Sequence, residues 1–161
     1  LEALETVARR TTHLLENEGT RRPTWFHRRL GEILDEGCGV SRSEAGLRAA
    51  LEQVRQLGAD FWADVRVGGR GDRLNQELER AGRVADFLEL AELMVVDALD
   101  RTESCGAHFR EEFTTELGEA LRDDERWVNV SAWETTPDGK HIRHTEPLAF
   151  ELVPLQVRDY R

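Results

Sequence analysis

The sequence lacks most of the features that mark a membrane, secreted or nucleic-acid-binding protein. No apolar run approaches the ~20 residues that a membrane helix needs, and no charged segment followed by an apolar one opens the chain as a signal peptide would. Two cysteines are too few for a disulfide scaffold, so we expect a cytoplasmic protein with reduced thiols. A net charge of −10 repels phosphate backbones, so we expect no nucleic-acid partner and no direct membrane insertion.

Methionine is also scarce. The chain begins at Leu1 and its only methionine is Met94, whereas a translation product begins with methionine. We therefore expect the 161 residues, the size of one domain, to be a fragment or a processed chain. A fragment can contain the scaffold of an activity without the residues that perform it.

The first part of the chain has the apolar spacing of two helices. From Leu4 onward, apolar residues recur at three- and four-residue steps, and we expect Gly19 to end this helix in the left-handed conformation. Pro23 suits the first turn of the second helix, because its missing N–H leaves no helical hydrogen bond unmade there. Gly37 and Gly39 close the second helix.

Two longer helices follow. Ser41-x-x-Glu44 matches a capping box, and near-heptad apolar spacing up to Val65 suits a long helix that lies antiparallel to another. Three glycines in VGGRGD end it, and the last helix is expected over about residues 73–100. Its second half, FLELAELMVVDAL, is apolar on nearly every side, so we expect it to be covered by the C-terminal section of the chain or by another domain.

After Asp100 the pattern changes to an alternation of apolar and polar residues. The alternation runs from Trp127 to a turn at TPDGK and resumes at Ile142, which indicates a β-hairpin. The predicted fold is mainly α. An antiparallel, spectrin-like three-helix bundle over residues 1–102 is followed over 103–161 by a loop, a β-hairpin and an extended tail, which pack on the bundle as one structural unit.

Cys105-x-x-His108 is the most suggestive chemical motif. A zinc site needs further close cysteine or histidine ligands, and the chain has no second such pair. A Cys105 thiolate with His108 as its base is an alternative, although the carboxylates of Glu103, Glu111 and Glu112 oppose thiolate formation.

Three other motifs favour ordinary structure over chemistry. His141 and His144 face opposite sides of a strand, GGRG lacks the lysine of a phosphate loop, and Arg122–Arg126 (RDDER) suits a polar turn with local charge pairs. We therefore expect no catalytic, cofactor-binding or metal-binding residue in this chain.

The stretch LELAELMVVDAL, then RTESCGAHFRE, then RDDERW resembles the C-terminal region of the flavoprotein subunit of succinate dehydrogenase and fumarate reductase. Upstream, LGEILDEGCGVSRSEAGLRAALEQVRQL resembles that family's helix, glycine-rich break, arginine and second helix. Cys105 replaces the arginine that the family usually has between serine and glycine. The matching positions are Arg101, Glu103, Ser104, Gly106, Ala107, His108, Arg110, Arg122, Asp123, Asp124, Trp127, Arg158 and Tyr160.

The resemblance implies a parent enzyme that interconverts succinate and fumarate. In that family a Rossmann-like domain holds FAD, a capping domain closes over the dicarboxylate, a hydride passes to the flavin, and an iron–sulfur subunit receives the electrons. The residues that bind FAD and substrate precede the C-terminal region, so the resemblance implies that this chain binds no FAD and is inactive alone. It also implies a parent complex at the cytoplasmic face of a bacterial membrane.

For this chain the resemblance implies a structural role, in which one loop docks on the flavin and capping domains or on the iron–sulfur subunit. The expected interface residues are Arg101, Glu103, Ser104, Gly106, His108, Arg110, Arg122, Asp123, Asp124 and Trp127. The alternative for these side chains is that they only satisfy one another inside the domain. Two alternatives for the whole chain are the C-terminal domain of L-aspartate oxidase and a free-standing helical protein-binding module.

Overall fold

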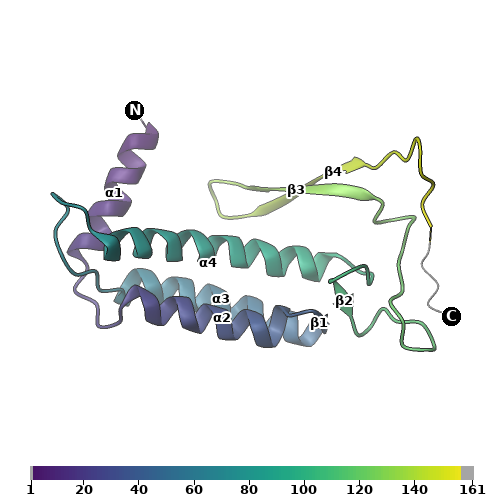
Figure 1. The fold of residues 1–161 in the computed structure, drawn as a ribbon. Helices are drawn as coiled ribbons and strands as arrows, with labels where there is room; N and C mark the ends of the chain where they lie inside the picture. Colours follow the sequence, from purple (N-terminus) through teal and green to yellow (C-terminus); the bar gives the residue numbers. More distant parts are fainter. Residues whose placement is uncertain (1, 157–161) are drawn as a thin grey trace. The chain divides into compact units, whose positions relative to one another are not determined.

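A computed structural model describes residues 2–156 (Figure 1), and the chain divides into two compact units between Leu121 and Arg122. Arg158 and Tyr160 of the family pattern lie outside the described residues. The first unit contains α1 (Glu2–Glu16), α2 (Pro23–Cys38), β1 (Ser41–Arg42), α3 (Glu44–Asp64), α4 (Gln76–Asp100) and β2 (Phe109–Arg110). The second unit contains β3 (Asn129–Thr135) and β4 (His141–Pro147).

Helices α2, α3 and α4 pack side by side as an antiparallel bundle, which confirms the predicted fold class (Figure 1). Phe26 and Phe61 meet edge to face in its interior, with ring centroids 5.2 Å apart. The small residue Gly37 brings α2 close to α3, since a Cβ there would lie 2.6 Å from the Cβ of Ala50. The other fully buried apolar side chains of the three helices include Leu47, Ala50, Val54, Ala81, Ala85 and Val95.

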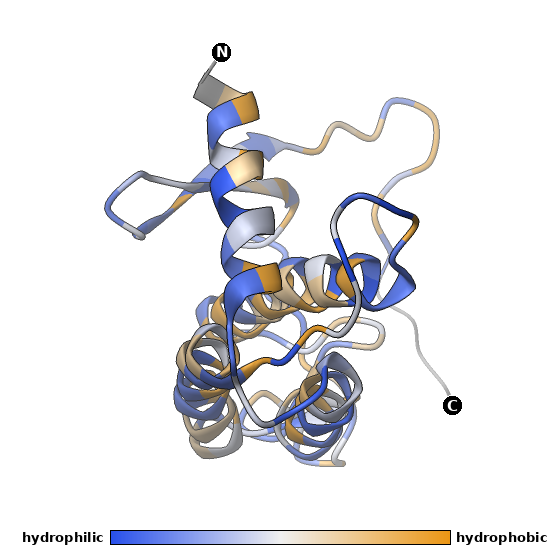
Figure 2. Cartoon of the chain, turned by 90° about the vertical axis from the view of Figure 1, so that its left-hand side faces the viewer, coloured by the Kyte–Doolittle hydropathy of each residue, from blue (hydrophilic) through white to orange (hydrophobic). Residues whose placement is uncertain are grey.

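Helix α1 precedes the three bundle helices in the chain, and its first turns rise away from the bundle (Figure 2). The apolar stripe that the sequence predicts is buried only at its C-terminal end, where Leu14 is 2% exposed. Leu4 and Val7 on the same stripe are 73% and 62% exposed. The apolar face of α1 therefore lies where the sequence predicts it. Among the described residues 2–156, however, other side chains cover only the last turn of that face.

Gly19 has a different role from the one predicted. It has no positive φ, so the prediction of a left-handed helix end at Gly19 is wrong. The residue instead lies against the C-terminal end of α3, where a Cβ would overlap the backbone carbonyl of Asp64. Next to it, the Thr20 backbone N–H donates to the Asp64 carboxylate at 2.7 Å. Glycine is needed here because the α1–α2 connection runs directly over that helix end.

The start of α3 corrects the predicted capping box. The Ser43 hydroxyl accepts the N–H of Gly46 at 3.1 Å and caps the helix, so the prediction that Ser41 does so is wrong. Ser41 belongs to β1, where its backbone pairs with Phe109 from far along the chain. Asn75 caps α4 in the same manner, and that helix begins a few residues later than expected.

The second half of α4 is buried on one side and open on another. Val95 and Ala98 are almost fully buried, whereas Phe87, Leu90 and Met94 are 41%, 54% and 48% exposed. What covers this open side stays a prediction. No helix among residues 2–156 is long and apolar enough to cross a membrane.

The second unit is an antiparallel hairpin, as predicted. Asn129 pairs with Pro147 at one end of the register and Thr135 pairs with His141 at the other. The turn between them includes Gly139, which has a φ of +78° and therefore occupies the left-handed region that glycine favours. Whether the hairpin packs on the bundle stays a prediction.

We predict that Gly19→Ala destabilises the chain, because the added methyl group meets backbone atoms that cannot rotate away. The expected loss is about 1–3 kcal/mol in the free energy of unfolding, measured by urea denaturation. Gly82→Ala is the matched control, since a Cβ at Gly82 meets nothing within 4 Å. In the interior of α4 that control should be neutral or stabilising by up to about 1 kcal/mol, and equal effects of the two substitutions would contradict the close approach.

Candidate functional site

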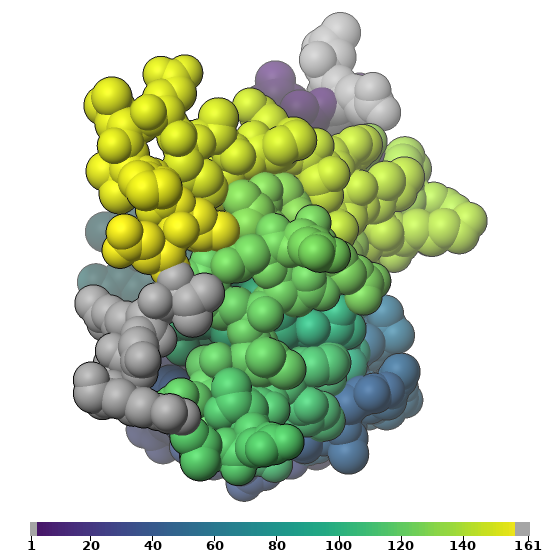
Figure 3. Space-filling view, turned by 90° about the vertical axis from the view of Figure 1, so that its right-hand side faces the viewer, coloured from purple at the N-terminus to yellow at the C-terminus, as the bar shows by residue number. Residues whose placement is uncertain are grey.

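The loop after α4, residues 101–121, folds back over the end of the bundle (Figure 3). Its strand β2 pairs in parallel with β1, so that Ser41 lies opposite Phe109 and Arg42 opposite Arg110. The N–H of Phe109 donates to the carbonyl of Val40 at 3.2 Å, and the N–H of Glu111 donates to the carbonyl of Arg42 at 2.9 Å. The loop is thereby joined to the start of α3.

Arg110 is the centre of this arrangement, and its side chain is only 2% exposed. Its Nη1 donates to the carbonyl of Ala98 at 2.9 Å and lies 3.4 Å from that of Leu99, in the last turn of α4. Its Nε donates to the carboxylate of Glu112 at 3.0 Å, and its guanidinium lies over the ring of Phe113. The cation therefore satisfies carbonyls that the helix end leaves without partners, at the negative end of the helix dipole.

Ser104 and Glu103 close the inner side of the loop. The Ser104 hydroxyl accepts the N–H of Arg110 at 2.8 Å and donates to the carbonyl of Arg110 at 3.1 Å. Glu103 accepts a hydrogen bond of 2.9 Å from the Nε of Arg101 and is 2% exposed. Each buried polar group thus has a partner within the domain, Arg110 for Ser104 and Arg101 for Glu103, as their burial requires.

The protonation of His108 follows from its two partners. Arg42 Nη1 lies 2.8 Å from His108 Nδ1, and a guanidinium can only donate, so Nδ1 accepts. The proton is therefore on Nε2, which donates to the carbonyl of Arg101 at 3.0 Å. Burial lowers the pKa of His108, and the positive charges of Arg42, Arg101 and Arg110 lower it further against the opposing effect of the Arg101 carbonyl. The ring is held neutral in one tautomer.

Glu112 connects the loop to the first turn of α3, because its carboxylate accepts the backbone N–H of Glu44 as well as the Nε of Arg110. A negative charge at that helix start is favourable for the helix dipole. Ser41, the incorrectly predicted cap, donates its hydroxyl to Glu111 at 3.0 Å.

Cys105 and Gly106 form the outer turn of the loop. Cys105 and His108 exchange two backbone hydrogen bonds of 2.8 and 3.1 Å, and Gly106 takes a φ of +60° between them. Both ring nitrogens of His108 have partners elsewhere, so the ring is not positioned as a base for the Cys105 thiol. Among the described residues 2–156, no group of three or more histidine, cysteine, aspartate or glutamate side chains is placed to hold a metal ion.

The remaining predicted site residues form a separate turn in the second unit. Arg122 pairs with Asp124 at 2.6 Å, and Asp123 accepts the N–H groups of Arg126 and Trp127. This is the polar turn with local charge pairing that the sequence favours. Arg143 lies over the ring of Trp127, whose Nε1 is buried and has no hydrogen-bond partner in the structure.

Arg42 is the member of the cluster that residue-by-residue reasoning missed. It lies 66 residues before His108, and it is half of the contact that fixes the ring. Its only signal in the sequence is the arginine after the glycine-rich break, which the family resemblance includes without giving it a role.

The described residues do not fit an FAD site. The only parallel strand pair among them has two residues in each strand, and no glycine-rich turn leads from a strand into a helix. A dinucleotide pyrophosphate needs such a turn at a helix start.

Comparison with known proteins decides the family. The profile of the family described as "Fumarate reductase flavoprotein C-term" matches residues 27–160. The chain belongs to this family. The fumarate reductase flavoprotein subunit of Helicobacter pylori strain 26695 is 36% identical over 122 residues, which are 74% of this chain and 16% of that protein. The succinate dehydrogenase flavoprotein subunit of Bacillus subtilis is 23% identical over 154 residues, 91% of this chain and 24% of that protein.

Solved structures show the same fold for this fumarate reductase flavoprotein C-terminal domain. A quinol fumarate reductase chain of Escherichia coli superposes with a TM-score of 0.80 at 23% identity, covering 96% of this chain and 26% of that one. Sdh1 of Mycobacterium smegmatis gives a TM-score of 0.75 at 24% identity, covering 95% of this chain and 25% of that one. The chain thus spans about a sixth to a quarter of the length of these relatives.

We predict that Arg110→Ala strongly destabilises this domain, because it removes the partner of the last α4 carbonyls and leaves them buried. The expected loss is about 2–5 kcal/mol in the free energy of unfolding, measured by urea denaturation. Arg48→Ala is the control, since Arg48 forms only an exposed pair with Glu44 on α3 and should change stability by less than about 1 kcal/mol. Similar losses in the two variants would contradict the role of Arg110.

We also predict that the domain loses stability when the pH falls below the usual histidine pKa of 6.5, because the pKa of His108 is lower in the folded state. The unfolded state then binds more protons than the folded state, so the contribution of His108 is complete above that value and declines as the pH drops toward the folded-state pKa. The free energy of unfolding should therefore fall as the pH drops through the usual histidine pKa of 6.5 toward the lower pKa of the folded state.

In His108→Gln this part of the pH dependence should disappear. In His144→Gln it should persist, because His144 is an exposed residue of β4 that pairs with Glu134. Identical pH profiles for the native chain and His108→Gln would show that another group is responsible.

Proposed function

We propose that this chain is the structural C-terminal domain of a flavoprotein that interconverts succinate and fumarate. Membership of the family over residues 27–160 carries the proposal, because the chain spans only a small part of relatives named for that chemistry. FAD would be held by the preceding part of the parent protein, and an iron–sulfur subunit would be its electron partner. The parent complex would lie at the cytoplasmic face of a bacterial membrane.

The internal bonding of the loop supports a structural role for this domain. Glu103 accepts from the side chain of Arg101, and Ser104 and Arg110 bond to each other and to backbone carbonyls, so these groups are committed to holding the loop in shape. A residue that binds substrate would instead present a polar group to an open site. We propose that the isolated chain is colourless and has no activity of its own.

We propose that the rigid loop docks through its exposed turn. Gly106 and Ala107 are exposed at its tip, and Gly106 allows another backbone to approach closely. Arg101 and the turn Arg122–Trp127 would add polar contacts to the flavin and capping domains or to the iron–sulfur subunit. In this arrangement the buried side chains of Glu103, Ser104 and Arg110 contribute to docking only indirectly, because they fix the shape of the exposed turn at Gly106 and Ala107.

The two whole-chain alternatives have less support. The relatives described above are fumarate reductase and succinate dehydrogenase subunits, which favours that pair over L-aspartate oxidase. A free-standing binding module is not favoured by similarity to a short part of much longer proteins.

We predict that His108→Ala in the full-length flavoprotein lowers its flavin content or its yield of assembled complex. The loop would lose the two hydrogen bonds of the His108 ring, one with Arg42 and one with the carbonyl of Arg101, so its docking turn would be less well ordered. Flavin absorbance per protein and gel filtration of the complex measure the two outcomes. His144→Ala is the control, and unchanged flavin content and assembly in His108→Ala would refute the docking role.

A further inference from the structure

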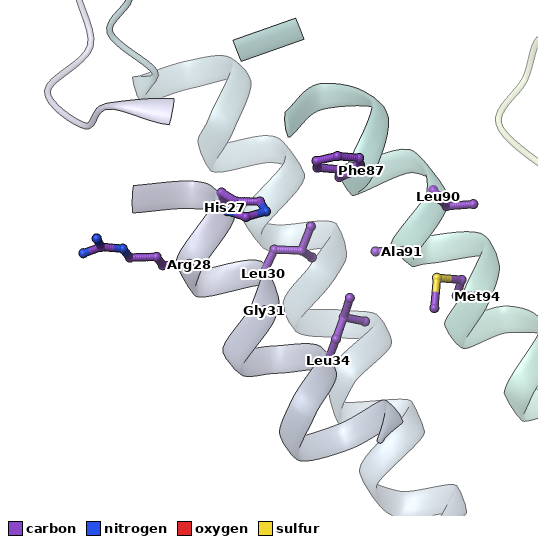
Figure 4. Close-up of a pocket in the computed structure, with 9 residues that line it drawn as sticks. All are labelled: His27, Arg28, Leu30, Gly31, Leu34, Phe87, Leu90, Ala91 and Met94. Atoms are coloured by element: carbon purple, nitrogen blue, oxygen red, sulfur yellow. The ribbon is translucent and has the colours of Figure 1, made fainter. Parts of the chain in front are cut away.

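An apolar groove runs between α2 and α4, away from the loop (Figure 4). Its volume is about 440 Å³, and Leu30 and Leu34 of α2 project into it toward α4. Phe87, Leu90 and Met94 form the opposite wall, and each is between 41% and 54% exposed. An open groove lined by apolar side chains is a candidate site for another molecule.

One of the α2 residues that line the groove is a glycine that the packing of the chain does not require. Gly31 lies in the middle of α2, where glycine costs about 0.5–1 kcal/mol relative to alanine. A Cβ built on Gly31 meets nothing within 4 Å, so the packing of the chain itself does not require its absence. With Ala91 on the α4 side, it leaves room for a guest backbone to come close to α2.

The ionisable side chains along the groove are all basic. A second hollow of about 240 Å³ shares His27 and Phe87 with the groove and is also lined by Arg80 and Arg83, while Arg28 lines the first. No carboxylate lines either hollow in the part of the chain that the structure describes. This basic border is a local feature of a chain whose net charge is −10.

Among the acidic residues of α4 near this region, Glu79 pairs with Arg83 of the second hollow at 2.8 Å, and two others pair away from the groove. Asp86 and Glu89 both pair with Arg10 of α1, at 3.0 and 3.3 Å. Arg28 lines the groove from α2, and Figure 4 shows its side chain extending outward from that helix.

We propose that this groove binds one amphipathic helix of a partner protein, with an apolar face against Phe87, Leu90 and Met94 and an acidic flank beside Arg28 and Arg80. The α2 lining from Pro23 to Leu34 is about 16 Å long at 1.5 Å per residue, enough for two to three turns of a guest. Guest helices in such grooves use apolar anchors at i, i+3 or i+4 and i+7, which span that length. The proposal does not depend on the proposed function.

Two synthetic helical peptides test the charge argument. Both carry leucines at the anchor positions, but one has glutamates on its flank and the other has lysines. By fluorescence anisotropy with the 161-residue chain, the glutamate peptide should bind at least about tenfold more tightly, and added salt should reduce the difference. Equal binding of both peptides, or binding of neither, would overturn the proposal.

Two matched substitutions test whether the peptide binds in the groove between α2 and α4. Gly31→Leu adds a side chain on the α2 side of the groove and should weaken binding of the glutamate peptide by at least about tenfold. Gly58→Leu on α3 is the control, because a Cβ at Gly58 also meets nothing within 4 Å and Gly58 does not line the groove. Circular dichroism checks that both variants are folded, and undiminished peptide binding by folded Gly31→Leu would place the peptide elsewhere and overturn the proposal.

If a molecule other than a partner helix fills the groove between α2 and α4, different experimental results are expected. If a second copy fills the groove, sedimentation without peptide will show a dimer that Gly31→Leu abolishes, and the proposal fails. If the rest of the parent flavoprotein fills it, a Gly31→Cys thiol will be protected from labelling in the full-length protein without any partner, and the proposal also fails. A monomeric chain and a readily labelled Gly31→Cys thiol in the full-length protein are the results that the proposal requires.

Discussion

The buried guanidinium of Arg110 is the constraint on which the end of the bundle depends. Carbonyl groups in the last turn of a helix have no partners within the helix, and burying them without partners is costly. Arg110 supplies donors to the carbonyls of Ala98 and Leu99 and is itself neutralised by Glu112, which also accepts the first N–H of α3. One side chain thus links the end of α4, the loop and the start of α3, and the neutral ring of His108 adds a second link through Arg42.

The sequence predicts the helical part of this fold well because helices are local. Apolar spacing located the bundle, and Asp138-Gly139 located the hairpin, since each signal depends on residues close together in the chain. The errors involve residues whose environment is made by distant segments. Ser41 matched a capping box, but its backbone pairs with Phe109, and Gly19 resembled a helix end, but it lies against Asp64.

The candidate site likewise contains residues that the sequence indicates and residues whose role depends on distant segments. The family resemblance selected most residues of the loop cluster, yet no pattern in one sequence shows that Glu103, Ser104 and Arg110 point inward rather than toward a partner. Arg42 completes the cluster from 66 residues away, and nothing local marks it as the partner of a histidine. The groove was missed for a related reason. The apolar second half of α4 predicts a cover from the C-terminal section or another domain, but it does not show which of its residues the bundle itself buries, such as Val95, and which it leaves open, such as Leu90.

The pairing of β1 with β2 has a consequence for how the domain folds. Ser41 and Phe109 are 68 residues apart, and closing so long a loop costs chain entropy that two-residue strands cannot offset by themselves. Helices α3 and α4, which lie between the two strands, must first form and pack so that the strands are already neighbours. We therefore expect the loop to form late in folding, so that in a nascent chain ending before Phe109 the C-terminal end of α4 is still open to solvent.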